Sequence, residues 1–558
     1  MSWFRKPVPT LAGWQLALLG ALYIVIAGNQ RLFGEIGDRL GAATGEAVLV
    51  LGSTLALLVC LQVILFMMLG GRRLLKPLIM IFAVLTAVVA YFDSSLGVIF
   101  DPEMIRNVVD TIREGNRQEA LDLASMSLGM HVALFCAPLG MILLWVRIRR
   151  TTWTVDLRQR LLVTVTAIVV IVAAAAPFYR DLSYFWRENR DLRVHVMPLF
   201  PILSAERFAE RSLGSGGEAF HDFKDPAVQE KNRRKPLLGV LVVGETARSD
   251  HFSLNGYQRD TNRYLQGDGV VSFANVTSCG TSTAYSIPCM FSLEPAEAFD
   301  PDEAGKEFNV LDVLEKAGVS VAWIDANSGC KGVCRRVETI DLNDRIPADR
   351  ASHVVYDEDL VPFLSSVGSP DGQDKLLVMH MLGSHGPAYS ERYPRDFGLF
   401  EPSCTDPAPQ QCDPTEVVNA YDNTIAYTDY VLHRLIGELQ SHGDEYDTFL
   451  LYVSDHGESL GENGVYLHGW PNRIAPPEQK AVAVIAWMSD DYYADHGLSR
   501  EGLAGRAHAQ LTHDFVSHSL LGLFDVRAAV YSDGLDVFRP EISAAAMASR
   551  PAGVHTGS

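Results

Sequence analysis

The second part of this chain has few basic residues. The 558 residues contain 47 Lys and Arg against 67 Asp and Glu. Residues 1–235 hold 26 of the basic and 20 of the acidic side chains, which leaves 21 and 47 for residues 236–558, a net charge of −26. A domain of this charge does not bind nucleic acid through bulk electrostatics and is not drawn to an anionic membrane surface. Its approach to any lipid therefore requires a tether and a local site.

The first third of the sequence lacks charge along its apolar stretches. Each stretch is close to the ~20 residues that cross a bilayer as a helix, and the scarcity of charge argues against buried helices of a soluble protein. Met1–Arg5 also lacks the pattern of a cleavable signal peptide. We therefore expect five transmembrane helices, at residues 11–28, 46–70, 77–92, 129–146 and 161–178.

Basic residues between these stretches predict their orientation. The positive-inside rule places the short basic segments in the cytoplasm. Five crossings from a cytoplasmic start then put everything after about residue 179 on the other side of the membrane. The basic residues are Arg5 and Lys6, then Arg72, Arg73 and Lys76, and finally Arg147, Arg149, Arg150, Arg158 and Arg160.

Charge and hydropathy together divide the chain into three parts. Residues 1–180 form the predicted transmembrane domain, and residues 236–558 alternate apolar runs with helical patterns, as an α/β domain does. Between them, residues 181–235 contain Tyr184, Phe185 and Trp186 among charged side chains, which favours an interfacial helix. A linker follows at Gly214-Ser-Gly-Gly, and for the second half of this segment an ordinary solvated linker is the alternative.

Cysteine is scarce, and its eight residues are unevenly placed. Cys60 and Cys136 fall in apolar stretches, whereas the other six form close pairs in sequence. Six cysteines allow fifteen connectivities, of which we predict nearest-neighbour pairing in an oxidising compartment. A structural zinc site is the alternative for the second pair, but no further pair of Cys or His lies near it. The predicted disulfides are Cys279 with Cys289, Cys330 with Cys334 and Cys404 with Cys412.

A run of hydroxyl side chains between Cys279 and Cys289 is the best candidate for a nucleophile. Thr281, Ser282 and Thr283 precede a predicted helix start, where backbone N–H groups and the helix dipole favour a developing negative charge. A single Thr is more often a helix cap or a surface residue, so the hydroxyl run gains weight only together with the carboxylates and histidines elsewhere in the chain.

Four apolar runs of the α/β part end on polar residues. In open parallel sheets ligands bind beyond the carboxyl ends of the strands, so these residues are expected to meet. Two carboxylates, an imidazole and a hydroxyl oxygen make a donor set of the zinc type. For His385, and for His468 in a glycine-rich loop, a structural role is the alternative. The runs are Leu238–Val243 before Glu245, Val319–Ile324 before Asn327, Leu376–Leu382 before His385, and Phe449–Val453 before Asp455 and His456.

These residues lie in motifs that resemble the membrane phosphoethanolamine transferases of Gram-negative bacteria, especially the lipid A phosphoethanolamine transferases and their mobile colistin-resistance relatives. The resemblance covers nearly the whole chain. Its motifs are Val243-Gly-Glu-Thr-Ala-Arg-Ser-Asp-His251, Asn255-Gly-Tyr-Gln-Arg-Asp-Thr261, Cys279–Cys289, Cys330-Lys-Gly-Val-Cys334, Gly383-Ser-His-Gly-Pro387 and Ser454-Asp-His-Gly-Glu-Ser-Leu-Gly-Glu462, with Tyr91-Phe-Asp93, Met104-Ile-Arg-Asn107 and Glu119-Ala-Leu-Asp-Leu123 in the membrane half.

The resemblance implies a fold and a set of site residues. The fold is a five-helix transmembrane domain in the bacterial inner membrane, followed by a periplasmic α/β domain of the alkaline phosphatase and sulfatase type. The implied zinc ligands are Glu245, Thr283, Asp455 and His456, with Thr283 also the nucleophile. The phosphoethanolamine group or a second zinc would be held by Asn327, Lys331, His385 and His468. The donor lipid would be bound by Asn107, Thr111 and Glu119, with Glu114 as a rival because residues 112–118 depart from the family's spacing.

The implied reaction is transfer of phosphoethanolamine from phosphatidylethanolamine to a lipid A phosphate through Thr283. Lys331 would add positive charge near the phosphate, and His385 or His468 would protonate the leaving oxygen. The added amine would lower the binding of polymyxins. We expect a monomer that contacts membrane lipids and no nucleic acid. Alternatives are another acceptor (a core sugar, a periplasmic glucan or a protein), a phosphatidylglycerol donor as in the lipoteichoic acid synthases, and a non-catalytic receptor for zinc or lipid.

Overall fold

The chain folds into two compact units that are interleaved in sequence. The computed structural model describes residues 9–41, 45–113, 125–214, 226–230, 233–342, 355–368 and 372–539. One unit, called the membrane unit below, comprises Met1–Pro102 and Ala124–Arg207. The other, called the α/β unit, comprises Glu103–Leu123 and Phe208–Ser558. Helix α5 (Pro102–Arg113) thus belongs with the α/β unit, although apolar helices precede and follow it in sequence.

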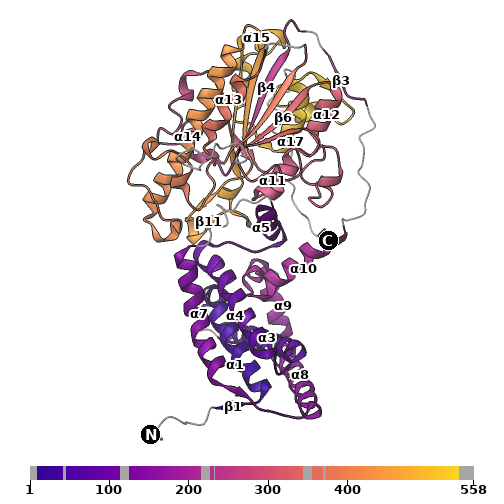
Figure 1. Cartoon of the computed structure of the whole chain (residues 1–558), viewed down its shortest axis with the longest axis vertical. Helices are drawn as coiled ribbons and strands as arrows, with labels where there is room; N and C mark the ends of the chain where they lie inside the picture. Colours follow the sequence, from indigo (N-terminus) through magenta and orange to yellow (C-terminus); the bar gives the residue numbers. More distant parts are fainter. Residues whose placement is uncertain are drawn as a thin grey trace. The chain divides into compact units, whose positions relative to one another are not determined.

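Long apolar helices build the membrane unit (Figure 1). Four are long and apolar enough to span a bilayer, and a fifth span results if the bent pair α1 and α2 counts as one. This agrees with the five predicted spans. The helices are α1 (Gly13–Gly28), α2 (Gln30–Leu40), α3 (Gly45–Leu69), α4 (Leu75–Tyr91) with the π-helix η1 (Phe92–Leu96), α7 (Met126–Trp145), and α8 (Trp153–Ala175), which continues through η2 (Ala176–Phe178) into α9 (Tyr179–Glu188).

The bend of 61° between α1 and α2 is fixed by one asparagine. The side-chain amide of Asn29 donates to the carbonyl oxygens of Val25, at 3.0 Å, and Met197, at 2.8 Å. Its Oδ1 accepts a hydrogen bond from the backbone N–H of Met197 at 2.8 Å. A buried asparagine that bonds to the backbone in this way competes with the helical hydrogen bonds around it. The chain therefore turns at residue 29, and residue 197 is held against the turn.

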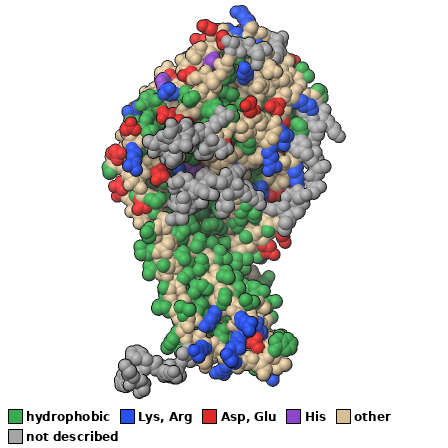
Figure 2. Space-filling model, in the orientation of Figure 1, with side chains coloured by type: hydrophobic (Ala, Val, Ile, Leu, Met, Phe, Trp, Pro, Cys, Tyr) green, Lys and Arg blue, Asp and Glu red, His purple; other side chains and the backbone are tan. Residues whose placement is uncertain are grey.

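The surface of the membrane unit matches the expected orientation. Figure 2 shows hydrophobic side chains over most of this unit, with Lys and Arg gathered at one end. An interfacial helix was predicted within residues 181–235; its first part, up to Glu188, continues the fifth span as one helix from Trp153 to Glu188. The 3₁₀-helix η3 (Arg190–His195) and helix α10 (Leu199–Gly214) follow. The predicted linker after Gly214 lies outside the described residues.

An eight-stranded sheet forms the centre of the α/β unit. Its order is β13-β5-β12-β9-β4-β8-β6-β7, and the five strands from β9 to β7 are parallel. Strand β12 runs antiparallel to both of its neighbours. The strands are β4 (Leu237–Gly244), β5 (Val271–Thr277), β6 (Ser320–Asp325), β7 (Glu338–Asp341), β8 (Lys375–His380), β9 (Asp447–Ser454), β12 (Ala481–Met488) and β13 (Leu511–Thr512).

Helices cover both faces of this sheet (Figure 1). All eight residues of β4 are buried, as expected for a parallel strand covered on both sides. Leu241 and Val243 of β4 join one hydrophobic core, whereas Val240 and Val242 join the other, because successive side chains point to opposite faces. The helices of the first face are α11 (Thr283–Met290), α12 (Val310–Ala317) and α17 (Asp514–Leu523), and those of the second are α13 (Val361–Ser365) and α14 (Pro414–Ser441).

The three predicted disulfides are confirmed. The bonds join Cys279 to Cys289, Cys330 to Cys334 and Cys404 to Cys412, while Cys60 and Cys136 are free thiols. All three bonds lie in the α/β unit. The first one joins the two ends of the segment that contains Thr283.

We expect Asp429→Asn to stabilise the protein at high pH. Asp429 on α14 accepts a hydrogen bond from the Tyr264 N–H, but burial raises its pKa to about 7. Since the folded pKa exceeds the unfolded value, the folded state loses stability as the pH rises from about 4 to about 7. Asparagine removes this charge, so the gain should be larger at pH 8 than at pH 5, by on the order of 2 kcal/mol.

Thermal unfolding of purified protein at the two pH values measures this difference. Asp444→Asn, at an exposed position of the same unit, is the control and should change neither melting temperature. Equal shifts for Asp429→Asn at pH 5 and pH 8 would contradict the assignment.

Candidate active site

Strand pairing brings two buried carboxylates together. Strands β4 and β9 are parallel with Gly244 level with Ser454, so the residues that follow, Glu245 and Asp455, leave the sheet side by side. Both are fully buried. The backbone at Thr246 has a φ of 54°, and its N–H donates to Asp455 Oδ1 at 3.2 Å. A left-handed backbone at a non-glycine residue is typical of functional sites.

Thr283 lies at the start of α11, as the sequence predicts. Its Oγ1 donates to Glu245 Oε2 at 3.0 Å and lies 3.3 Å from His456 Nε2. The first turn of a helix leaves N–H groups without helical partners, so its dipole and donors face this hydroxyl. The hydroxyl of Thr281 instead donates to the carbonyl oxygen of Trp470 at 2.6 Å. Only Thr283 of the two thus meets the carboxylates.

His513 holds the segment before Thr283 against the end of β9. Its Nδ1 accepts the N–H of Cys279 at 3.2 Å, and its Nε2 donates to the carbonyl oxygen of Ser454 at 3.0 Å. Burial lowers the pKa of His513 to about 4. The neutral ring can therefore accept at one nitrogen and donate at the other, which an imidazolium cannot do.

Glu245, Asp455 and His456 form a group that fits a metal ion. One ligand atom from each lies within 4.8 Å of the others. Glu245 Oε1 and Asp455 Oδ2 are buried and form no hydrogen bond among the described residues. They lie 3.2 and 3.4 Å from His456 Nε2. Buried carboxylate oxygens without donors need a cation, and this donor set suits zinc.

The electrostatics of the group point the same way. Burial and the charge of Glu245 raise the pKa of Asp455. Burial lowers the pKa of His456, but the two carboxylates outweigh this effect and raise it to about 10. The cluster therefore stabilises a positive charge at this position, and a bound divalent cation meets the same requirement.

Asn327 fixes the orientation of Glu245. Its side-chain amide donates to Glu245 Oε2 at 3.0 Å and to the carbonyl oxygen of Met381 at 2.9 Å. It also lies 3.3 Å from His380 Nε2, and His380 Nδ1 lies 3.2 Å from Asp325 Oδ2. A network of buried polar side chains at the ends of β6 and β8 thus supports Glu245, which follows β4. Such outer partners hold metal ligands in place.

Two further predicted histidines meet at the same edge of the sheet. The ring of His468 lies 4.4 Å from that of His456 and 5.4 Å from that of His385, between centroids. His468 Nδ1 lies 2.7 Å from Glu458 Oε2, and the other carboxylate oxygen of Glu458 accepts the hydroxyl of Tyr389 at 2.7 Å. Burial lowers the pKa of His468. Donation from Nδ1 to Glu458 leaves Nε2 as the acceptor of a neutral ring.

Lys331 lies in the loop that follows β6. Its ammonium group donates to the carbonyl oxygen of Ser328 at 2.6 Å and to the Ser328 hydroxyl at 3.0 Å. The backbone of Lys331 has a φ of 50°, and the Cys330–Cys334 bond closes the loop around it. The loop that brings Asn327 to Glu245 therefore also carries this cation.

Helix α5 packs onto the α/β unit and carries Asn107, which is buried. Arg106 donates to the carbonyl oxygen of Pro301 at 2.9 Å and pairs with Asp302. A Cβ on Gly469 would lie 2.5 Å from Met104 Cε, so α5 touches the loop that carries His468. The side chains of Thr111, Glu114 and Glu119 lie outside the described residues.

Comparison with known proteins finds a family model for each part of the chain. A sulfatase family model matches residues 238–526, and a model described as phosphoethanolamine transferase EptA/EptB matches residues 58–213. The phosphatidylethanolamine transferase Mcr-1 of Escherichia coli is 35% identical over 551 residues, which cover 95% of this chain and 98% of the relative. The chain belongs to the phosphoethanolamine transferase family.

Further relatives support this membership over the full length. The phosphoethanolamine transferase EptA of Escherichia coli K12 is 35% identical over 544 residues, covering 96% of this chain and 98% of the relative. The structure of lipooligosaccharide phosphoethanolamine transferase A from Neisseria meningitidis matches with a TM-score of 0.88 at 29% identity, covering 95% of this chain and 99% of that one. This transferase is accordingly an inner-membrane protein whose catalytic α/β domain lies in the periplasm.

Sequence reasoning missed four residues that support the site, namely Asp325, His380, Glu458 and His513. The run Leu376–Leu382 was predicted to be strand throughout, but β8 ends at His380 because the backbone turns there toward Asp357. The N–H groups of Leu382 and Gly383 donate to that carboxylate at 2.7 and 3.0 Å. Placement at a strand end could have identified Asp325 and His380, whereas nothing in the sequence around His513 indicates its role.

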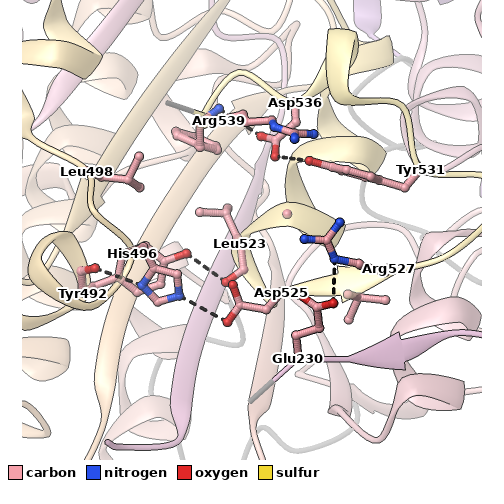
Figure 3. A pocket seen from close by; sticks show the side chains of 13 residues that line it. Glu230, Tyr492, His496, Leu498, Leu523, Asp525, Arg527, Tyr531, Asp536 and Arg539 are labelled. Atoms are coloured by element: carbon pink, nitrogen blue, oxygen red, sulfur yellow. Dashed lines mark hydrogen bonds and ion pairs between the residues drawn. The ribbon is translucent and has the colours of Figure 1, made fainter. Parts of the chain in front are cut away.

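A cavity of about 240 Å³ in the α/β unit lies apart from these residues. Figure 3 shows its lining, where Arg527 pairs with Glu230 and Tyr531 donates to Asp536. Part of the lining comes from α15 (Asp490–Asp495), which packs beside the first residues of β9. Asp455 follows the last residue of β9, so the cavity lies at the opposite end of this strand from the candidate site. Its lining includes none of the predicted site residues.

Reversing the charge of Arg106 should slow phosphoethanolamine transfer by about tenfold, because Arg106→Asp replaces an ion pair with repulsion and loosens α5. Asp302→Arg should act similarly, and the double variant should recover most of the rate. Arg434→Asp, the same change on the exposed side of α14, is the control. The rates are compared as changes in activation free energy. If the change in the double variant equals the sum of the two single changes, the pair does not hold α5.

Proposed function

We propose that this enzyme transfers phosphoethanolamine from phosphatidylethanolamine to a phosphate group of lipid A. Thr283 is the nucleophile, and zinc is the cofactor. One observation carries the proposal: the hydroxyl of Thr283, at the start of α11, lies 3.0 Å from Glu245 and 3.3 Å from His456, beside carboxylate oxygens that lack donors. A binding protein needs no nucleophile at that point. The names of the relatives, which include a Kdo(2)-lipid A phosphoethanolamine transferase of Salmonella typhimurium, favour lipid A as the acceptor.

Glu245, Asp455, His456 and the Thr283 oxygen would hold the zinc ion. Bound zinc lowers the pKa of the hydroxyl and offsets charge on the phosphoryl oxygens. The residues around it prepare the site for this ion. Asn327 keeps Glu245 in position, and the backbone N–H groups of Thr246 and His456 hold Asp455 Oδ1, at 3.2 and 2.7 Å. Asp455 Oδ2 and Glu245 Oε1 then remain for the metal.

In the first half-reaction the Thr283 oxygen attacks the phosphorus of phosphatidylethanolamine. A bond from Oγ1 to phosphorus forms, and the bond from phosphorus to the diacylglycerol oxygen breaks. The leaving oxygen gains a proton and Thr283 loses one, so the step balances without a further reactant. We assign the proton transfer to His385 and His468. The neutral ring of His468, with Nδ1 held by Glu458, presents Nε2 as a proton acceptor.

In the second half-reaction a phosphate oxygen of lipid A attacks the same phosphorus. A bond from that oxygen to phosphorus forms, the bond from phosphorus to Thr283 Oγ1 breaks, and the proton that the attacking phosphate group loses restores the Thr283 hydroxyl. Lys331 and the N-terminus of α11 stabilise the negative charge that spreads over the phosphoryl oxygens. The product carries an added ammonium group, which offsets the charge of lipid A. Cationic peptides such as polymyxins then bind it less well.

Asn107 on α5 contacts the donor lipid in this proposal. The segment that contains it is joined to apolar helices at both ends, yet it packs on the α/β unit next to the loop of His468. A polar side chain at that position suits a lipid headgroup that must stay close to the bilayer while its phosphorus reaches Thr283.

Replacement of Thr283 by Ala should abolish transfer, because the covalent step has no other oxygen. Lipid A from cells that express the wild-type enzyme should gain one phosphoethanolamine group by mass spectrometry, and cells with Thr283→Ala should show none. Thr281→Ala is the matched control and should keep much of the activity, since its hydroxyl faces the Trp470 carbonyl. Thr283→Ser should keep part, because the oxygen remains but the methyl group that restricts χ1 is lost.

Trapping of the intermediate tests the same assignment directly. With donor present and acceptor withheld, intact-mass and peptide analysis should place phosphoethanolamine on Thr283. An adduct on Thr281, or full transfer by Thr283→Ala, would refute the role of Thr283. An adduct on Thr283 together with unmodified lipid A would refute only the acceptor.

Loss of either carboxylate should lower the zinc content of the purified protein. Glu245→Gln and Asp455→Asn each remove one negative charge from the buried group, which then holds a divalent cation at least tenfold less tightly, by about 1.4 kcal/mol or more. Elemental analysis of zinc per chain measures this, and a chelator should lower the melting temperature of the wild type more than that of either variant. The control Asp444→Asn should keep the wild-type zinc content. Full zinc occupancy in Asp455→Asn would contradict its role as a ligand.

A further inference from the structure

The membrane unit contains a cavity of about 540 Å³, within the range of sites that take a small amphiphile. It lies between α3 and the continuous helix of α8 and α9. One part of its lining is apolar, with Leu57 of α3 and Ile171, Ala175 and Leu182 of the continuous helix. The other part is polar and aromatic, with Ser53, Thr54, Tyr179, Ser183, Trp186, Arg187, Arg190 and Arg193.

The arginines of this cavity are at the end of the unit where basic residues are expected to be rare. The positive-inside rule concentrates Lys and Arg at the cytoplasmic ends of spans, whereas α9 and η3 follow the periplasmic end of the fifth span. Within the described part of the chain, Arg187 and Arg190 form no ion pair with a carboxylate. Arg193 donates to the backbone oxygen of Trp186 at 2.7 Å. Three arginines thus line the cavity.

A buried hydroxyl deeper in the cavity also lacks a partner. Thr54 is only 4% exposed, and its Oγ1 forms no hydrogen bond among the described residues. The hydroxyl of the neighbouring Ser53 donates to the carbonyl oxygen of Ala174 at 3.2 Å. The hydroxyl of Thr54 is thus available to donate to a ligand. A buried hydroxyl without a partner costs roughly 1–3 kcal/mol, which a ligand with an acceptor oxygen would recover.

We propose that this cavity binds an anionic glycerophospholipid of the periplasmic leaflet. Its phosphate would lie among Arg187, Arg190 and Arg193. Its ester carbonyl would accept the hydrogen bond of Thr54, and one acyl chain would pack on Leu57 and Ile171. Trp186 and Tyr179 suit the level of the headgroup, where amphipathic rings are enriched. The site is separate from the one that carries out phosphoethanolamine transfer.

The charge and size of the cavity select this class of lipid. A ring of three cations repels the ammonium group of phosphatidylethanolamine but attracts the single net negative charge of phosphatidylglycerol. Lipid A carries more phosphate and several more acyl chains than a cavity of about 540 Å³ accommodates. A free phosphate ion would not reach Thr54 and the arginines together with the apolar wall.

Quenching of Trp186 fluorescence by brominated lipids tests the proposal. Full-length enzyme is placed in phosphatidylcholine nanodiscs that contain brominated phosphatidylglycerol or brominated phosphatidylethanolamine, and the signal of Trp186 is the difference between wild type and Trp186→Phe. Brominated phosphatidylglycerol should quench at a mole fraction about tenfold lower than brominated phosphatidylethanolamine. Arg187→Gln with Arg190→Gln should remove this preference.

Two further variants keep the test decisive. Arg72→Gln with Arg73→Gln removes the same charge at the cytoplasmic end and should leave the preference unchanged. Thr54→Val, which has nearly the same shape, should weaken the quenching by phosphatidylglycerol several-fold even if the arginine variant folds poorly. Equal quenching by the two lipids in the wild type overturns the proposal. So does displacement by soluble glycerol phosphate alone, or stronger competition by lipid A than by phosphatidylglycerol.

Discussion

The two buried carboxylates at the ends of β4 and β9 are the constraint on which the site depends. Glu245 and Asp455 are brought level by parallel pairing, and their oxygens Oε1 and Oδ2 receive no hydrogen bond among the described residues. Two such charges in a dry interior are unstable without a cation. The position of His456 and the hydroxyl of Thr283 follow from that need, because a metal between the carboxylates would also meet these two groups.

Much of the surrounding fold keeps this cluster rigid. A series of polar contacts from Asp325 through His380 and Asn327 holds the side chain of Glu245. His513 connects Cys279 to the end of β9. The Cys279–Cys289 bond closes the segment that contains Thr283. These contacts come from the ends of strands β6, β8 and β9 and from the residue before α17, so the large hydrophobic core on each face of the sheet serves to fix a few polar atoms at the carboxyl ends of the strands.

The membrane unit contains the membrane-spanning helices, and the α/β unit contains the candidate active site. Helix α5 joins the α/β unit through Arg106 although the chain enters and leaves it from apolar helices. A part of the catalytic unit is thus tied covalently to membrane helices on both sides. The acidic α/β unit has a net charge of −26 over residues 236–558 and gains little from anionic lipid, which makes such a tether necessary.

The sequence by itself determined the spans, the compartment, the strands that precede the site residues and the disulfide pairs, because each depends on local composition or short spacing. Recognition of motifs supplied Thr283 over Thr281, a choice that spacing leaves open. Tertiary structure alone decided that Thr281 faces the Trp470 carbonyl, that β8 stops at His380, and that His513 supports the segment before Thr283. The physical reason is that a hydrogen bond between residues 59 or 189 positions apart is set by sheet order and helix packing, which no local pattern encodes.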